Sequence, residues 1–154
     1  MIKGIYEAHL PVSHIEDSIV FYEKLGLELA YKGERVTFLW IEKGKSWLGL
    51  WESESVEVPY HPSIRHLAFH VELEDIKQAK EWLNKKGIYV RDAFGFSEDE
   101  QPLVLTNSNN AHAAIYFNDP DGNSIELITP LELDMKEEKE MMTLSAWEEE
   151  IGFV

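Results

Sequence analysis

The feature of this sequence that most constrains the fold is an internal repeat of one supersecondary pattern. Residues 5–12, Ile-Tyr-Glu-Ala-His-Leu-Pro-Val, predict a strand that leads at once into a helix stopped by Gly26. The pattern starts again with a strand over 65–71 and a helix over 74–86 that Gly87 ends. Because each repeat is one supersecondary unit, the sequence predicts two halves of the same design.

The first helix carries the clearest local signals. Ser13 is followed three residues later by Glu16, which is the spacing of a capping box. Apolar side chains then recur at helical spacing: Ile15, Ile19, Tyr22 and Leu25. We therefore expect a helix that begins at Ser13 and ends before Gly26.

Strands complete both halves. Three strand candidates follow the first helix, over 27–33, 35–42 and 46–52. Three more follow the second helix, over 88–92, 112–118 and 124–128, and Asp119-Pro-Asp-Gly122 joins the last two as a hairpin turn. Each half reads β-α-β-β-β, which predicts an α+β fold. We expect one domain over 1–130, with modules of about 4–52 and 64–130.

Two segments lie outside the repeat. Residues 93–111 form a long Ser-, Asn- and acid-rich insertion that the first half lacks, which is expected to be either a lid or a surface loop. Residues 131–154 form an acidic extension that also carries apolar side chains such as Trp147 and Phe153. A purely solvated tail would not need them, so a docked helix is predicted.

Composition excludes several classes of function. The 154 residues suffice for one domain, and their formal net charge of −15 disfavours binding to nucleic acids and anionic membranes. There is no cysteine, so a metal could be bound only by His and carboxylate side chains. No apolar stretch has the length of a signal peptide or a membrane span, so we expect a cytoplasmic protein.

Three motifs together carry a family resemblance. They are Asp17-Ser-Ile-Val-Phe-Tyr-Glu-Lys-Leu-Gly26, His66-Leu-Ala-Phe69 and Tyr116-Phe-Asn-Asp-Pro-Asp-Gly-Asn-Ser-Ile-Glu-Leu-Ile128. Over about residues 4–130 the chain resembles the vicinal-oxygen-chelate superfamily, the glyoxalase, bleomycin-resistance and dioxygenase group. The resemblance implies mixed sheets curled around a central cup, a divalent metal held there, and a homodimer.

The resemblance also implies the metal ligands. They are Glu7, where the family usually has His, with His66 and Glu126. The fourth ligand of the glyoxalase branch would fall on Gly49, so a glyoxalase I isomerase is disfavoured. The three-ligand pattern is closest to the fosfomycin-resistance-like branch. One imidazole and two carboxylates suit Mn, Fe, Zn, Ni or Mg.

Strand parity adds further candidates around that site. Side chains two apart share a face, so His9 lies beside Glu7, and His70 lies on the face of His66. His9 and His70 are candidate proton shuttles, and Tyr116 matches a substrate-contacting tyrosine of the resembled branch. Three more side chains are expected to line the substrate pocket: Trp47, Trp51 and His112. The ordinary alternative for the histidines is a structural role, and for the aromatic residues it is core packing.

The sequence therefore predicts a divalent-metal-dependent enzyme of this superfamily that acts on a small oxygenated molecule. The expected reaction is a lyase, an isomerase, or a thiol or water transfer reaction. One alternative is a metal-free small-molecule binding protein of the bleomycin-resistance type. A second alternative is a ring-cleaving dioxygenase, although that branch usually has two histidine ligands and a longer chain.

Overall fold

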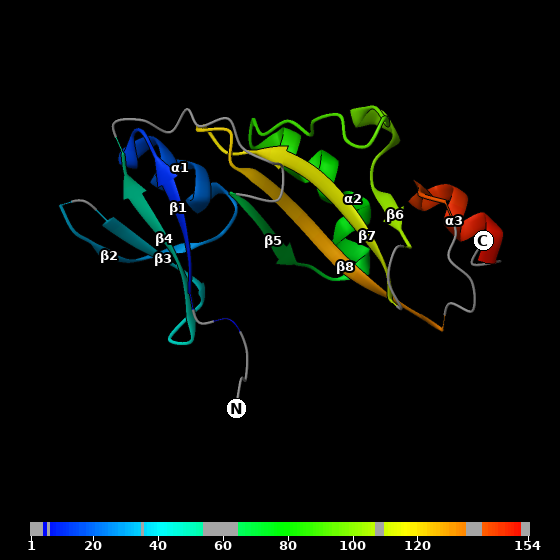
Figure 1. The fold of residues 1–154 in the computed structure, drawn as a ribbon, viewed down its shortest axis with the longest axis horizontal. Coiled ribbons are helices and arrows are strands. Elements are labelled where there is room, and N and C mark those ends of the chain that lie inside the picture. The colour runs from blue at the N-terminus through cyan, green and yellow to red at the C-terminus, as the bar shows by residue number, and fades with distance from the viewer. Residues whose placement is uncertain are drawn as a thin grey trace. The chain divides into compact units, whose positions relative to one another are not determined.

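The structure, a computed structural model, describes residues 5, 7–34, 36–53, 65–106, 110–134 and 140–151. The fold is α+β, with two mixed sheets and three α-helices in the described ranges (Figure 1). The chain divides into two compact units. The first consists of residues 1–67 with 119–124, and the second of residues 68–118 with 125–154.

The first sheet has four strands in the order β1-β4-β3-β2, with β1 and β4 parallel and β3 antiparallel to both of its neighbours. Their bounds are β1 Glu7–Val12, β2 Glu28–Lys32, β3 Val36–Glu42 and β4 Ser46–Glu52. Helix α1 (Ile15–Lys24) contacts this sheet. The core between them is made of buried apolar side chains: Leu10, Val12, Ile19, Tyr22, Leu39, Leu48 and Leu50.

The second sheet has five strands in the order β5-β8-β7-β6-β9. Their bounds are β5 His66–His70, β6 Leu103–Leu105, β7 Asn110–Asn118, β8 Ser124–Asp134 and β9 Met142–Thr143. Helix α2 (Leu73–Lys85) contacts β7 and buries Ile76, Ala79 and Leu83. Helix α3 (Leu144–Ile151) follows β9 and contacts β6 and β9. No helix in these described ranges is long and apolar enough to cross a membrane.

Two local predictions are wrong. The first helix has His14 at its N-cap without a side-chain cap bond, because the Ser13 hydroxyl donates instead to Asp121 Oδ1 at 2.5 Å. The strand expected over 88–92 is reduced to one bridge between Val90 and Phe117. After that bridge the chain leaves the sheet into a tight turn, in which Ala93 bonds to Phe96.

The hairpin turn before β8 is fixed by a buried network around Asp119. Its Oδ1 accepts backbone N–H groups from Asp121 and Asn123, and its Oδ2 accepts the Tyr22 hydroxyl at 2.9 Å and the Asn123 amide. Burial raises the pKa of Asp119 despite these donors. Asn123 also donates to the Pro11 carbonyl, so the turn is bound to the end of β1.

Candidate functional site

The first sheet presents a polar and aromatic face opposite the α1 core. The parallel register pairs Glu7 with Trp47, His9 with Gly49 and Pro11 with Trp51. Trp47 Nε1 donates to Glu7 Oε2 at 2.8 Å, and Trp51 Nε1 donates to His9 Nδ1 at 2.7 Å. The structure thus brings together four of the predicted site residues, Glu7, His9, Trp47 and Trp51, on one exposed face.

The Trp51 bond determines the tautomer of neutral His9. An indole N–H can only donate, so Nδ1 of His9 accepts and the ring proton lies on Nε2. Nε2 is 3.5 Å from Glu7 Oε1. His9 therefore directs an N–H toward the Glu7 carboxylate, and neither of its nitrogens offers a free lone pair to a metal in this arrangement.

Gly49 is explained by the position of the His9 ring. A Cβ added at Gly49 would lie 2.2 Å from His9 Nδ1 and 3.1 Å from Phe38 Cε1. The imidazole thus occupies the space that a side chain at Gly49 would need. The position at which the resemblance expects a fourth ligand in the glyoxalase branch is filled by a neighbouring side chain.

Glu7 is held as a carboxylate. The hydrogen bond from Trp47 lowers the pKa of Glu7, and the bond from His9 lowers it further. Its side chain is 44% exposed, so water also solvates the charge. Around it, aromatic rings continue the face: the Trp47 ring centroid lies 5.4 Å from that of Phe38 and 5.2 Å from that of Trp40.

The second sheet carries a buried pair on the neighbouring strands β7 and β8. The Tyr116 hydroxyl donates to Glu126 Oε1 at 3.2 Å, and the two residues are 4% and 5% exposed. Burial raises the pKa of Tyr116, and the Glu126 charge raises it further. The phenol therefore remains protonated at neutral pH and can act only as a hydrogen-bond donor to a carboxylate.

Three residues that the sequence did not single out surround Tyr116. The Arg91 guanidinium carbon lies 5.6 Å from the centroid of its ring, and Phe94 meets that ring edge-on at 5.4 Å. Gln101 accepts the Tyr116 backbone N–H and donates to the Arg91 carbonyl. Phe94 and Gln101 belong to the predicted insertion, whose strand β6 pairs with β7, so this part of the insertion is fixed in the sheet.

The three predicted histidines of the second sheet occupy different strand positions. His66 begins β5, next to β8, and its Nδ1 lies 3.2 Å from Ser124 Oγ. His70 ends β5 in an exposed position and lines a pocket near α2 and α3. His112 is half-buried on β7, opposite Leu105 of β6.

The fit of a metal can be judged from the donor atoms. Glu7 belongs to the first sheet, whereas His66 and Glu126 lie on neighbouring strands of the second. Among the described residues, no group of three or more His, Asp or Glu side chains already forms a metal-binding cluster. The donor set itself, one imidazole and two carboxylates, suits a divalent ion.

Comparisons with known proteins agree with this architecture. The sequence model described as Glyoxalase/Bleomycin resistance protein/Dioxygenase superfamily matches residues 4–127. The chain is 29% identical to "Metallothiol transferase FosB" of Staphylococcus saprophyticus, over 97% of this chain and 94% of the relative. It is 32% identical to the protein of that name in Staphylococcus epidermidis, over 84% of this chain and 85% of the relative.

A solved structure shows the same fold. The integron cassette protein HFX_CASS4, from the mobile metagenome of a Halifax Harbour sewage outfall, superposes with a TM-score of 0.62. It is 28% identical, over 83% of this chain and 99% of the other. The two staphylococcal relatives confirm the predicted closeness to the fosfomycin-resistance-like branch. The chain belongs to the Glyoxalase/Bleomycin resistance protein/Dioxygenase superfamily.

Proposed function

We propose that this protein is a divalent-metal-dependent transferase that adds a thiol to a small oxygenated molecule. The superfamily membership supports an enzyme of this group, and the similarity to proteins named metallothiol transferase supports the reaction class. The observation that carries the proposal is the buried Glu126 carboxylate, bonded to Tyr116 on β7 and next to the strand that bears His66. A carboxylate buried in this way is stabilised by a cation.

The ion would be held by Glu7, His66 and Glu126. When bound, a divalent ion supplies Lewis-acid polarisation of the substrate oxygens. Mn, Fe, Zn, Ni and Mg all accept this donor set, with oxygen-rich sites favouring Mn and Mg. The Trp47 bond keeps Glu7 ionised, which a carboxylate ligand requires.

The remaining side chains bind substrate and hold protons. Tyr116 keeps its proton and fixes the orientation of Glu126, while the neighbouring Arg91 supplies a positive charge for an anionic part of a substrate. His9 carries a proton on Nε2, and Trp51 holds the ring in that tautomer. His9 and His70 are proposed as proton carriers. Side chains from both sheets are proposed to contact substrate: Trp47, Trp51 and His112.

A metal-free small-molecule binding protein of the bleomycin-resistance type is the second candidate. One observation favours it: both oxygens of Glu7 face N–H groups of this chain's own side chains, Trp47 and His9. A carboxylate satisfied in this way needs no metal. In that case the aromatic face of the first sheet would bind the apolar part of a ligand.

Metal titration tests the proposal. By calorimetry we expect about one Mn²⁺, Zn²⁺ or Ni²⁺ ion bound per protein chain. Binding should be at least about tenfold weaker in His66→Ala and in Glu126→Ala, because each variant removes one ligand. His112→Ala is the matched control, a histidine on β7 that is not a proposed ligand. If no metal binds at saturating concentrations, the enzyme proposal is rejected and the metal-free small-molecule binding protein is favoured. Oxygen consumption with catechols in the iron-loaded protein would favour ring cleavage instead.

The thiol-transfer step and the expected homodimer have separate tests. With metal bound, we expect loss of a free thiol in the presence of a small epoxide, measured colorimetrically, and no loss without metal. Light scattering would then give the mass of the assembly, where a dimer of the 17.8 kDa chain is expected. If metal binds but no thiol is consumed, the thiol-transfer reaction is rejected and the proposal of a metal-dependent enzyme remains.

A further inference from the structure

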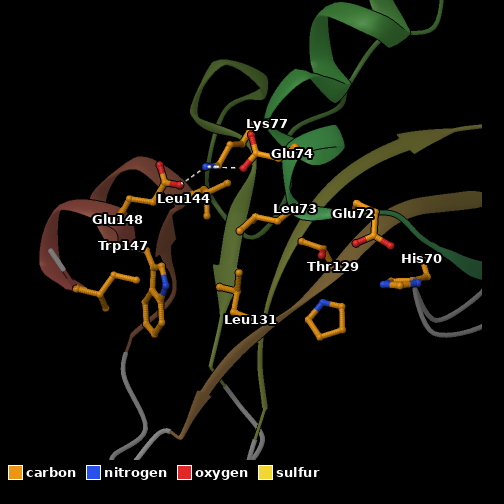
Figure 2. A pocket seen from close by; sticks show the side chains of 12 residues that line it. His70, Glu72, Leu73, Glu74, Lys77, Thr129, Leu131, Leu144, Trp147 and Glu148 are labelled. Carbon is orange, nitrogen blue, oxygen red and sulfur yellow. Dashed lines mark ion pairs between the residues drawn. The ribbon is translucent and has the colours of Figure 1, made fainter. Parts of the chain in front are cut away.

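A pocket in the second unit has none of the three proposed metal ligands among its described lining residues. Figure 2 shows it between α2, the distal part of β8 and α3. Its volume is about 640 Å³. Two of its walls, residues 129–131 and the helix α3, follow the segment that matches the superfamily. The acidic extension therefore forms a cavity of the size that ordinarily accepts a small molecule.

The interior of this pocket is apolar. Leu131, Leu144 and Trp147 line it and are 8%, 4% and 1% exposed. Leu73, from the first turn of α2, adds a further apolar wall. In Figure 2, Leu73, Leu131 and Trp147 lie around the same space, which would take an aliphatic or aromatic group.

The charges at the rim are mostly negative. Lys77 is the only lysine or arginine among the lining residues that the structure describes, and it forms ion pairs with Glu148 at 2.8 Å and Glu74 at 3.6 Å. At the other side, Glu72 is exposed, and among the described residues it has no hydrogen-bond or ion-pair partner for its side chain. The described lining thus combines an apolar interior with three carboxylates against one lysine, and Glu72 is the carboxylate that the lysine does not contact.

The start of α2 does not reverse this charge preference. A helix N-terminus carries a partial positive charge that favours anions. Here the backbone N–H groups of Asp75 and Ile76 already bond to the Glu72 carbonyl, and Glu74 and Asp75 stand in the first turn. An anion entering the pocket would also meet the carboxylates of Glu72 and Glu148.

We propose that this pocket binds a small cationic amphiphile. Its protonated amine pairs with Glu72, and its apolar body lies against Leu131 and Trp147. The Lys77 to Glu148 ion pair joins α2 to α3 and so keeps the two walls together. This site does not depend on a bound metal, and its proposed amine and apolar contacts do not include His70, the lining residue that is also proposed as a proton carrier.

A matched pair of ligands tests the charge preference. The probes are 4-phenylbutylamine and 4-phenylbutyrate, which have the same apolar body and opposite charges. By calorimetry at pH 7, we expect the amine to bind at least about tenfold more tightly. We also expect the amine to shift the indole N–H resonance of Trp147, assigned by its loss in Trp147→Phe.

Two isosteric variants test the role of Glu72. Glu72→Gln should weaken amine binding about three- to tenfold, because it removes one partly desolvated charge pair. Glu149→Gln removes the same charge from an exposed position of α3 outside the lining, and binding should stay within about twofold because a solvated charge that does not contact the ligand is screened. Neither side chain is buried, so both variants are expected to fold.

Several results would overturn the proposal. Equal binding of the amine and the carboxylate would remove the charge preference, and equal affinities of Glu72→Gln and Glu149→Gln would remove the assigned partner. A Trp147 resonance that shifts with protein concentration alone would show a second copy of the chain in the pocket. Loss of metal binding in His66→Ala with unchanged amine binding would leave this proposal intact, so the two proposed sites are tested independently.

Discussion

The two sheets share a predicted plan but treat their polar side chains differently. On the first sheet, Glu7 and His9 lie on an exposed face and are held by indole N–H groups from the adjacent strand. On the second, Tyr116 and Glu126 form a pair that is almost fully buried. One half thus keeps its carboxylate in water, whereas the other keeps it in the protein interior.

This difference has a consequence for proton and metal chemistry. Water and two N–H donors stabilise the charge of Glu7, and the pKa of Glu7 is lowered. At Tyr116, burial is the largest effect, and it raises the pKa of the phenol. The same type of module therefore holds an exposed, ionised carboxylate on one sheet and a buried, protonated phenol on the other.

The largest expected effect is that of Gly49→Ala, which breaks the arrangement of the first sheet. The new Cβ would overlap the His9 ring, so the ring must leave its bond to Trp51. We expect a loss of about 1–3 kcal/mol in the free energy of unfolding, the usual cost of overpacking. Chemical denaturation measures it.

A double variant checks that His9 is the cause of this loss. His9→Ala removes the overlapping ring. In that background, Gly49→Ala should lower the free energy of unfolding by at least about 1 kcal/mol less than it does in the unaltered protein. An equal cost in both backgrounds would mean that the Cβ clashes with Phe38 or the strand itself. The placement of the His9 ring over Gly49 would then be wrong.

The next effect compares two identical hydroxyl deletions. Tyr116→Phe removes a donor from a buried carboxylate, and we expect a loss of about 1–2 kcal/mol in the free energy of unfolding. Tyr31→Phe, on the first sheet, alters a side chain that is 58% exposed and should change stability by less than about 0.5 kcal/mol. Thermal or urea unfolding measures the stability of both variants. Similar losses of stability in the two variants would contradict the difference in burial between Tyr116 and Tyr31.

A smaller effect is expected at alkaline pH. The pKa of Tyr116 is raised in the folded state, so above about pH 10, the ordinary tyrosine pKa, the unfolded chain releases a proton that the folded chain retains. Stability should therefore fall as pH rises through this range. Tyr22 is also buried and also has a raised pKa, so the test is a shallower slope in Tyr116→Phe than in the unaltered protein. Parallel slopes would show that Tyr116 is solvated.

The smallest effect concerns Glu7 at acid pH. Its folded pKa lies below its ordinary value, so the stability it adds is present above that ordinary value and is lost as pH falls through the folded pKa. Because Glu7 is exposed, the shift is better measured directly, by following its carboxyl carbon in an NMR titration. Trp47→Phe should return the pKa of Glu7 toward the ordinary value, and an unchanged pKa would exclude the indole bond as its main cause.

Helices and strands were predictable from the sequence where the spacing of apolar and aromatic residues is regular. The helical spacing before Gly26 placed α1, and the alternation along 46–52 placed β4 with Trp47, Gly49 and Trp51 on one face. The start of α1 was not predictable from the capping pattern. Ser13 bonds to Asp121, more than a hundred residues away in the chain, and so is not available to cap the helix.

The sequence named candidate site residues but not the contacts that they make. Parity placed Glu7 and His9 on one face, yet only the parallel pairing of β1 with β4 puts Trp47 beside Glu7 and His9 over Gly49. Arg91 and Phe94 reach Tyr116 from a segment that was expected to be partly strand and partly loop. No periodic pattern marks such residues, because their role depends on a turn that closes against β7.

The sequence by itself determined the repeated β-α-β-β-β plan, the faces of its strands and helices, and the residue types available to a metal. These depend on local spacing, which is written along the chain. The tertiary structure decided which side chains meet: the indole bonds to Glu7 and His9, the buried Tyr116 to Glu126 pair, and the pocket that α3 completes. The physical reason is that strand order and burial arise from contacts between distant segments, and these contacts set the hydrogen-bond partners and pKa values on which the chemistry depends.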